Sequence, residues 1–339
     1  MSRIKDVQRL VPRTTSASLD VWAVVLAGGD GSRLRQLTTT DAGEAVPKQY
    51  CTINRERCLL QDSLRRAVAV APTERICAVV ASQHQRWWQK ALAQFPAENT
   101  FVQPSNRGTA FEILLALTKL EQRARAESAV LLLPADYFVS IESVMAQSLI
   151  RISEFAIAEP ESVFLLGAEP EEAEEELGYI VPWHSAALLP VSVYSFVEKP
   201  DQRQALKLMN DGALWNTFII GGTVRSLLNL FEPEFFDEIS EFRAALADSL
   251  PAPAANPRLS ELYARLLSVD FSKTILERKT SGVQVLRLPA CGWSDLGTPQ
   301  RLEQTARAHY SAPELTHDYL DLTRQFVRTD ATSERERRH

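Results

Sequence analysis

Cysteine and histidine are both scarce in this sequence. The 339 residues include four cysteines and five histidines, with no C-x-x-C pair and no metal-ligand spacing among the histidines. Structural zinc sites and disulfide frameworks are built from regularly spaced clusters of these residues. The sequence therefore predicts neither a zinc site nor a fold held together by disulfides.

Long apolar runs are also missing. Residues 1–20 form a polar leader without the apolar stretch of a secretory signal, and no later run approaches the roughly 18 apolar residues that a membrane span requires. We therefore expect a cytoplasmic protein with no membrane partner.

The chain has no surplus of basic residues either. Its formal net charge is −6, and hydrophobic residues make up 45% of it, which is enough for a substantial core. Because nucleic-acid-binding surfaces need concentrated positive charge, we expect no nucleic-acid partner. An anionic ligand would have to bind in a local pocket. The composition leaves open whether the chain forms a homo-oligomer.

Short apolar runs alternate with segments of helical periodicity through the first half of the chain. The runs are VWAVVLA, ICAVVAS, TFVQP and AVLLLPAD. This alternation predicts a Rossmann-like, three-layer α/β fold whose central sheet is mostly parallel, with some mixed pairing, and is covered by helices on both faces. The second half is less regular, and we interpret it as an extension of the same sheet.

A glycine-rich stretch, VVLAGGDGSRLRQLT, follows the first apolar run. Glycines let backbone N–H groups approach an anion closely, and Arg33 beside them can form a forked contact with phosphate oxygens. Neither G-x-x-x-x-G-K-[ST] nor G-x-G-x-x-G occurs. The stretch indicates a phosphate site, although a flexible strand-to-helix turn with a solvent-facing arginine is the simpler alternative.

Two aspartates stand at predicted strand ends, Asp136 in LLLPADYFV and Asp295 in GWSDLGTP. Magnesium is usually held by one or two carboxylates together with substrate phosphates. Either aspartate alone is more typical of a turn or a helix cap. Their combination with the glycine stretch favours a nucleotide site.

Two lysines have proline neighbours, Lys48 in AVPKQY and Lys199 in FVEKP. Proline stiffens the backbone, so each side chain can be aimed at a ligand, although a surface lysine in a turn is an equal alternative. Glu198 can accept hydrogen bonds from sugar hydroxyls. Asn216 lies in the apolar frame ALWNTF and must be hydrogen-bonded, either to the backbone or to a ligand.

The motifs LAGGDGSRLRQLT, PKQY, QPSNRGTA, PADYFV, GYI, FVEKP, LWNTF and GWSDLGTP follow in this order from Leu26 to Pro299. Together they resemble the sugar-1-phosphate nucleotidyltransferases. PKQY followed by CLLQDSLRRA is most similar to the mannose-1-phosphate guanylyltransferases, which make GDP-mannose. The resemblance implies a nucleotidyltransferase fold and the reaction of a nucleoside triphosphate, here GTP, with a sugar 1-phosphate, here mannose 1-phosphate.

The resemblance also implies roles for individual residues. It assigns nucleotide binding to Leu26, Ala27, Gly28, Gly29, Gly31, Ser32, Arg33, Lys48, Gln103, Arg107, Gly108 and Thr109. It assigns sugar-phosphate binding to Gly178, Glu198, Lys199 and Asn216, and Mg²⁺ binding to Asp136 and Asp295. The catalytic set is Arg33, Lys48, Asp136, Lys199 and Asp295. The implied domain spans residues 21–310, with a nucleotide half at about 21–140 and a sugar half at about 141–310, and residues 311–339 form a C-terminal helix and charged tail.

Three residues depart from the family pattern. Gln36 replaces a common proline, Gln103 stands where guanylyltransferases often have glutamate, and Tyr137 stands where histidine is common. The alternative reaction is uridylyl, adenylyl or thymidylyl transfer to glucose 1-phosphate. The alternative from another class is a non-catalytic regulatory subunit of the same fold. We see neither an isomerase domain nor a β-helix after about residue 310 and expect one activity.

Overall fold

The computed structural model describes most of the chain between Asp20 and His309. The described ranges are 20–31, 34–35, 37–39, 43–52, 57–185, 189–247 and 256–309, the side chains of 306–309 excepted. The predicted leader, almost all of which precedes these ranges, and the predicted C-terminal helix and tail lie outside the described residues.

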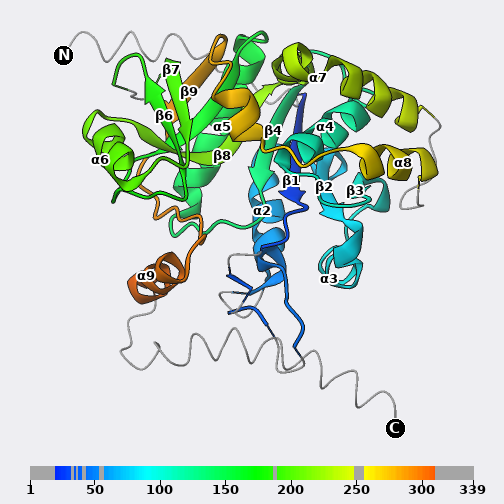
Figure 1. Ribbon diagram of the computed structural model, residues 1–339, viewed down its shortest axis with the longest axis horizontal. Coiled ribbons are helices and arrows are strands. Elements are labelled where there is room, and N and C mark those ends of the chain that lie inside the picture. Colours follow the sequence, from blue (N-terminus) through cyan, green and yellow to red (C-terminus); the bar gives the residue numbers. More distant parts are fainter. Residues whose placement is uncertain are drawn as a thin grey trace.

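Within these ranges the chain forms one nine-stranded sheet with helices on both faces (Figure 1). The strands are β1 (Val21–Ala27), β2 (Ile76–Ala81), β3 (Thr100–Gln103), β4 (Ala129–Pro134), β5 (Val163–Ala168), β6 (Gly178–Pro182), β7 (Val191–Glu198), β8 (Leu214–Thr223) and β9 (Val283–Arg287). The helices are α2 (Leu59–Ala67), α3 (Gln85–Ala91), α4 (Thr109–Leu120), α5 (Glu142–Ala158), α6 (Gln202–Asn210), α7 (Val224–Leu246), α8 (Pro257–Arg265) and α9 (Pro299–His309). Single turns at η2 (Lys48–Tyr50) and η6 (Ser272–Leu276) border the cavity described below. The predicted α/β fold is confirmed.

The first four strands are parallel, as the alternation of strands and helices predicts. β1 pairs with β2 and with β4, and β2 pairs with β3. Every residue of β1 is buried, because helices cover both faces of the sheet here. The carboxyl ends of these strands therefore open at one edge of the sheet, where α/β proteins bind their ligands.

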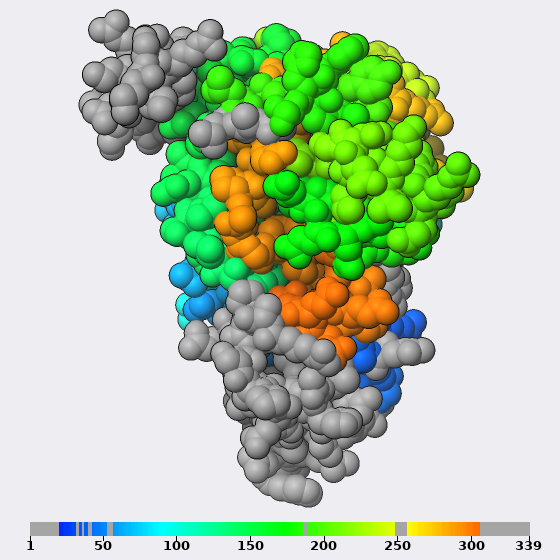
Figure 2. Space-filling model, turned by 90° about the vertical axis from the view of Figure 1, so that its left-hand side faces the viewer, coloured from blue at the N-terminus to red at the C-terminus, as the bar shows by residue number. Residues whose placement is uncertain are grey.

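The second half of the sheet is largely antiparallel. The strand order is β3-β2-β1-β4-β8-β5-β9-β7-β6, and β8 runs antiparallel to both of its neighbours, β4 and β5. Among the described strands of this half, only β5 and β9 pair in parallel, so the sheet as a whole is mixed. β6 and β7 are joined by a short connection, which antiparallel strands allow and parallel strands do not. In Figure 2 the orange segment around β9 lies between green segments from the middle of the chain.

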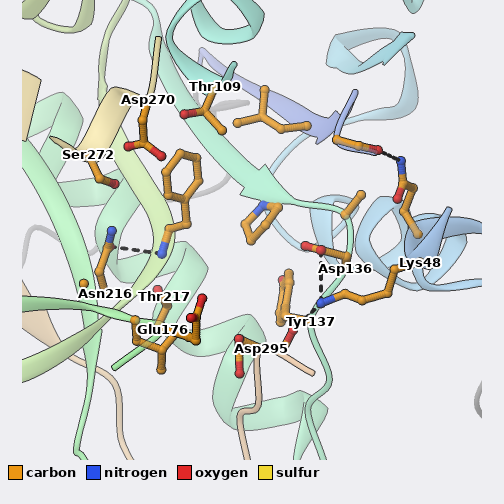
Figure 3. A pocket seen from close by; sticks show the side chains of 18 of the residues that line it. Lys48, Thr109, Asp136, Tyr137, Glu176, Asn216, Thr217, Asp270, Ser272 and Asp295 are labelled. Atoms are coloured by element: carbon orange, nitrogen blue, oxygen red, sulfur yellow. Dashed lines mark hydrogen bonds and ion pairs between the residues drawn. The ribbon is translucent and has the colours of Figure 1, made fainter. Parts of the chain in front are cut away.

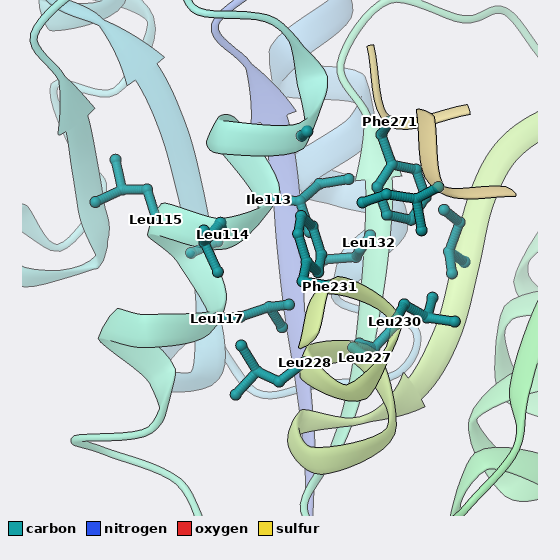
Figure 4. Packing of buried hydrophobic residues seen from close by; sticks show 14 of the residues in the cluster. Ile113, Leu114, Leu115, Leu117, Leu132, Leu227, Leu228, Leu230, Phe231 and Phe271 are labelled. Carbon is teal, nitrogen blue, oxygen red and sulfur yellow. The ribbon is translucent and has the colours of Figure 1, made fainter. Parts of the chain in front are cut away.

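The core has two layers, one on each face of the sheet. On β1, Trp22 and Val24 face one layer while Ala23 and Val25 face the other, as the two-residue period of a strand requires. The first layer packs α4, α7 and α8 against the sheet, and Figure 4 shows Ile113 and Leu117 of α4 near Phe231 and Leu228 of α7. The second layer includes α2 and α5.

The helices of the described ranges include none with the length and apolar character of a membrane span.

Candidate functional site

A cavity of about 270 Å³ lies at the carboxyl ends of β1 and β4 and extends to β6, β7 and β8 (Figure 3). Many of the residues singled out in the sequence line it: Leu26, Ala27, Gly29, Gly31, Lys48, Thr109, Asp136, Gly178, Glu198, Lys199, Asn216 and Asp295. The fold thus gathers around one space residues that are dispersed over most of the sequence. Their individual roles stay predictions.

Four predicted nucleotide-binding residues are not among those that line the cavity, namely Gly28, Gln103, Arg107 and Gly108. Gln103 is fully buried, and its Nε2 donates to the carbonyl of Gly28 at 3.4 Å. Arg107 donates through Nε to the carbonyl of Tyr263 at 2.8 Å. Gly108 begins α4 with a φ of +84°, and a Cβ on it would lie 2.2 Å from the carbonyl oxygen of a neighbouring backbone. Ser32 and Arg33 lie outside the described residues, as does Gln36.

The glycine-rich loop is held by the segment that carries Lys48. Gln49 Nε2 donates to the carbonyl oxygens of Ala27 at 2.9 Å and of Gly29 at 2.7 Å. Gly31 has a φ of +59°, and a Cβ there would lie 2.8 Å from the amide nitrogen of Lys48. The loop therefore needs glycine at position 31. Gln49 had no role in our sequence interpretation, although it belongs to the PKQY motif.

Asp30, within the same loop, is tied to two neighbouring strand ends. Its carboxylate accepts from Gln83 Nε2 at 3.1 Å and from Asn106 Nδ2 at 2.9 Å. His84 Nε2 lies 3.5 Å from Asp30 Oδ1. Burial lowers the pKa of His84, and the negative charge of Asp30 only partly opposes this shift. Neutral side-chain donors therefore fix the loop from one side.

Lys48 joins the two predicted metal ligands. Its Nζ lies 3.1 Å from Asp136 Oδ2 and donates to the backbone carbonyl of Asp295. The side chain of Lys48 is 8% exposed and that of Asp136 is 44% exposed. A buried ammonium between these two groups provides positive charge at the cavity wall.

The two aspartate segments are paired directly with each other. Phe138 donates its amide to the carbonyl of Ser294 at 2.8 Å, and the Ser294 amide returns a bond of 3.0 Å. Arg66 adds support after Asp136, because it donates to the carbonyl of Tyr137 at 3.1 Å and forms an ion pair with Glu142. Phe138 lies two residues after Asp136, and Ser294 lies one residue before Asp295. The backbone pairing of Phe138 with Ser294 therefore brings the two aspartate segments together.

Arg301 of α9 holds the Asp295 side of the site. Its Nη1 lies 3.5 Å from Asp295 Oδ1, its Nε donates to Glu174 at 3.0 Å, and its guanidinium stacks over Trp215 at 4.3 Å. The sequence offers no signal for this role, because Arg301 lies in an ordinary amphipathic helix beyond the recognisable motifs.

The donor set at Asp136 and Asp295 fits Mg²⁺. The described residues contain no group of three or more His, Cys, Asp or Glu side chains that could bind a metal. Asp295 Oδ1 is buried without a hydrogen-bond partner in the described structure. Two carboxylates suit a magnesium ion that takes its remaining ligands from water and phosphate.

The opposite wall comes from β6, β7 and β8. Gly178 and Glu198 are directly opposed across the β6–β7 pair, and a Cβ on Gly178 would lie 2.6 Å from Glu198 Oε2. Lys199 follows with a φ of +49°. Asn216 Oδ1 accepts from the amide of Phe218 at 3.0 Å, so the backbone uses its acceptor and its Nδ2 donors remain. Both alternatives for Asn216 therefore stay open.

Several lining residues had no place in our sequence interpretation, namely Glu112, Glu176, Thr217, Asp270, Ser272 and Trp293. Glu112 had a visible signal, because it is the single charged residue of the apolar run TAFEILLAL. Its side chain is buried, and its Oε1 accepts from the amide of Gly28 at 2.7 Å. Burial raises its pKa to about 8, and the charge of Asp136 adds to this shift.

Known proteins and a family model are similar to this chain over almost all of its described residues. The sequence model of the nucleotidyl transferase family matches residues 22–311. The chain is 27% identical over 291 residues to the xanthan biosynthesis protein XanB of Xanthomonas campestris pv. campestris (strain B100), covering 82% of this chain and 58% of XanB. It is 27% identical over 301 residues to mannose-1-phosphate guanylyltransferase 2 of Escherichia coli O157:H7, covering 83% of this chain and 59% of that protein.

The chain therefore spans little more than half the length of these two relatives. A solved structure, described as mannose-1-phosphate geranyltransferase from Thermus thermophilus, is similar with a TM-score of 0.72 and 26% identity. That likeness covers 85% of this chain and 79% of the other.

Proposed function

The chain belongs to the nucleotidyl transferase family, and on that premise we propose that it transfers a guanylyl group from GTP to mannose 1-phosphate and releases pyrophosphate. The observation that carries this proposal is the position of Lys48, Asp136 and Asp295 in one cavity, between the glycine-rich loop and the wall formed by Glu198 and Lys199. The mannose-1-phosphate guanylyltransferase among the relatives supports the choice of substrates.

The reaction needs no general base on the protein. A phosphate monoester has its second pKa near ~6, so the attacking oxygen of the sugar phosphate is already ionised at neutral pH. Catalysis then consists of holding two anions in line and offsetting their charge. The cavity is lined by the buried Lys48, the exposed Lys199 and the glycines Gly29 and Gly31. This lining suits the task.

Each wall of the cavity has its own part in this mechanism. The loop of Gly29 and Gly31 admits the triphosphate, and Lys48 balances its charge. Lys199 binds the phosphate of the sugar, while Glu198 and the Nδ2 donors of Asn216 bind sugar hydroxyls. Arg33 stabilises the departing pyrophosphate.

Asp136 and Asp295 would hold Mg²⁺. When bound, the ion neutralises phosphate charge and orients the reacting groups. The backbone pairing of Phe138 with Ser294 keeps both carboxylates in place for this.

The test is a grid of four nucleoside triphosphates against several sugar 1-phosphates, including mannose 1-phosphate and glucose 1-phosphate, with pyrophosphate release as the readout. We expect the highest kcat/KM for GTP with mannose 1-phosphate. A higher value for UTP or ATP would reject guanylyl transfer while leaving the reaction class intact. Absence of release with every pair would favour a regulatory subunit without turnover.

A further inference from the structure

A buried carboxyl group belongs to the cavity wall on the nucleotide side. Glu112 lies in the first turn of α4, is 5% exposed and still lines the cavity. An ionisable side chain in so apolar a helix is costly unless its polar atoms are used. Oε1 accepts from the amide of Gly28 at 2.7 Å, and the Ala27 amide also favours the ionised form. A carboxylate has about four lone-pair sites, so acceptor capacity remains.

Glu112 lies on a side of the cavity that is separate from both the sugar and the phosphate sides of the proposed site. The proposed sugar-binding wall consists of residues on and next to β6, β7 and β8, and Figure 3 shows Lys48 with Asp136 on a different side of the cavity. Figure 3 places Thr109, which begins the helix of Glu112, on the side away from Glu176 and Thr217. If the sugar occupies the wall of β6, β7 and β8 and the phosphates lie beside Lys48, the side toward Thr109 and Glu112 is left for the base of the triphosphate.

Glu112 and Gln103 contact the same glycine but differ in access. A Cβ on Gly28 would lie 2.0 Å from Gln103 Nε2 and 2.9 Å from Glu112 Oε1. Gln103 is fully buried and lies outside the cavity wall, whereas Glu112 is part of it. The carboxylate beside Gly28 therefore comes from α4.

The chemistry of a carboxylate selects one base among the common four. Its ionised form, which hydrogen bonds from a ligand favour, offers only acceptors, and guanine presents two adjacent donors, N1–H and the 2-amino group. Adenine places an acceptor next to its amino group, and uracil has one donor between two carbonyls. Resting on the proposed function, we propose that Glu112 is the residue that selects guanine, by accepting hydrogen bonds from N1–H and the 2-amino group.

Inosine triphosphate provides a sharp test, because it differs from GTP only by lacking the 2-amino group. Dissociation constants of both nucleotides are measured by titration calorimetry with Mg²⁺ at about pH 8.5, where the carboxyl of Glu112 is mostly ionised. We expect the wild-type chain to bind GTP at least ~10-fold more tightly than ITP, the effect of one hydrogen bond to a charged acceptor. In Glu112→Gln and Glu112→Ala the two nucleotides should bind within about threefold of each other.

The matched control is Glu121→Gln, which changes a glutamate at the other end of α4 that pairs with Arg243. Its GTP-to-ITP ratio should equal that of the wild type. Equal affinities in the wild type, or a ratio that persists in both Glu112 variants, would overturn the proposal and leave Glu112 as a support for Gly28.

The wild-type comparison requires no substitution, so a misfolded variant cannot hide a negative result. Because binding is measured without a sugar phosphate, the test is independent of the second substrate. A wild type that prefers GTP to UTP and ATP but ignores the 2-amino group rejects the role of Glu112 alone. A wild type that prefers UTP or ATP rejects guanylyl transfer as well.

Discussion

Lys48 Nζ lies 3.1 Å from Asp136 Oδ2, so the cation expected to contact the nucleotide phosphates is paired with a carboxylate expected to hold magnesium. The two side chains come from the segment after the glycine-rich loop and from the end of β4. A Mg²⁺ ion held by Asp136 would share this carboxylate with the ammonium, which would leave Lys48 freer to contact phosphate. On the proposed function, the pair would therefore link metal binding to nucleotide binding.

Replacement of the metal carboxylates should abolish most of the turnover. Asp136→Asn and Asp295→Asn each remove a negative charge from the proposed Mg²⁺ site, and we expect kcat to fall at least ~100-fold in each variant. The measurement is pyrophosphate release as a function of Mg²⁺ concentration. Asp237→Asn, an exposed change on α7, is the control. Near-normal magnesium-dependent rates in either variant would refute the metal assignment.

The two lysines should affect different substrates. Loss of a charge-assisted hydrogen bond weakens the contacted ligand by about 1.5–3 kcal/mol, or about 10–100-fold. Lys48→Ala should chiefly raise KM for the nucleotide, and Lys199→Ala chiefly KM for the sugar phosphate. Some loss of kcat is expected in both, because the contacts strengthen as charge redistributes.

The measurement for the lysines is a pair of KM values for each variant. Arginine at either position should rescue poorly, since its planar fork requires a different geometry. Lys207→Ala, on the exposed side of α6, should change neither KM. A reversed pattern, or equal effects on both substrates, would show that the cavity is not divided into nucleotide and sugar sides.

Gly108 should be far less replaceable than Gly212, although both have positive φ. Their φ values are +84° and +83°, so alanine is strained at both positions, and at Gly108 the ψ of 170° adds to the strain because that combination is essentially restricted to glycine. At Gly108 the new Cβ would also lie 2.2 Å from Val269 O, whereas at Gly212 nothing lies within 4 Å. We expect the free energy of unfolding to fall by at least ~2 kcal/mol more for Gly108→Ala than for Gly212→Ala. Urea unfolding measures both, and equal losses would contradict the close packing of residue 108 on Val269.

Glu112 should make stability depend on pH. Its folded pKa of about 8 lies above its ordinary value of 4.5, because burial and the charge of Asp136 disfavour ionisation. Between these values the folded chain binds a proton that the unfolded chain releases. Its stabilising contribution is thus complete below about pH 4.5 and declines as pH rises through about 8, by at most about 1.4 kcal/mol per pH unit.

Urea unfolding of the wild type and Glu112→Gln from about pH 5 to pH 8.5 measures this contribution. The difference in the free energy of unfolding between the two proteins should shift in favour of the variant as pH rises. Tyr50 and Tyr263, which also interact electrostatically with Glu112, stay protonated over this range because burial raises their pKa. A difference that does not vary with pH would show that Glu112 titrates normally in the folded chain.

Local patterns determined much of the fold and part of the site. The apolar runs that became β1 and β4 are readable because a strand buried on both faces needs consecutive apolar residues. The sequence predicts that Asp136 and Gly29 lie at the ligand-binding edge of the sheet, because both follow such runs and the strand ends of a parallel sheet meet at one edge. Lys48 and Lys199 could be selected from their proline neighbours, but their separate positions around the cavity could not.

Only the tertiary structure decided the features that depend on contacts between distant segments. The direction of β8 follows from its pairing with β4 and β5, which no periodicity encodes. Arg301 forms an ion pair with Asp295 because α9 packs beside the Asp295 segment. Gln49 donates a hydrogen bond to the carbonyl of Ala27, which lies 22 residues earlier in the sequence. Glu112 lines the cavity while Gln103 does not, although both side chains lie beside Gly28. Side-chain hydrogen bonds and ion pairs act over a few ångströms in space, so sequence separation neither predicts nor excludes them.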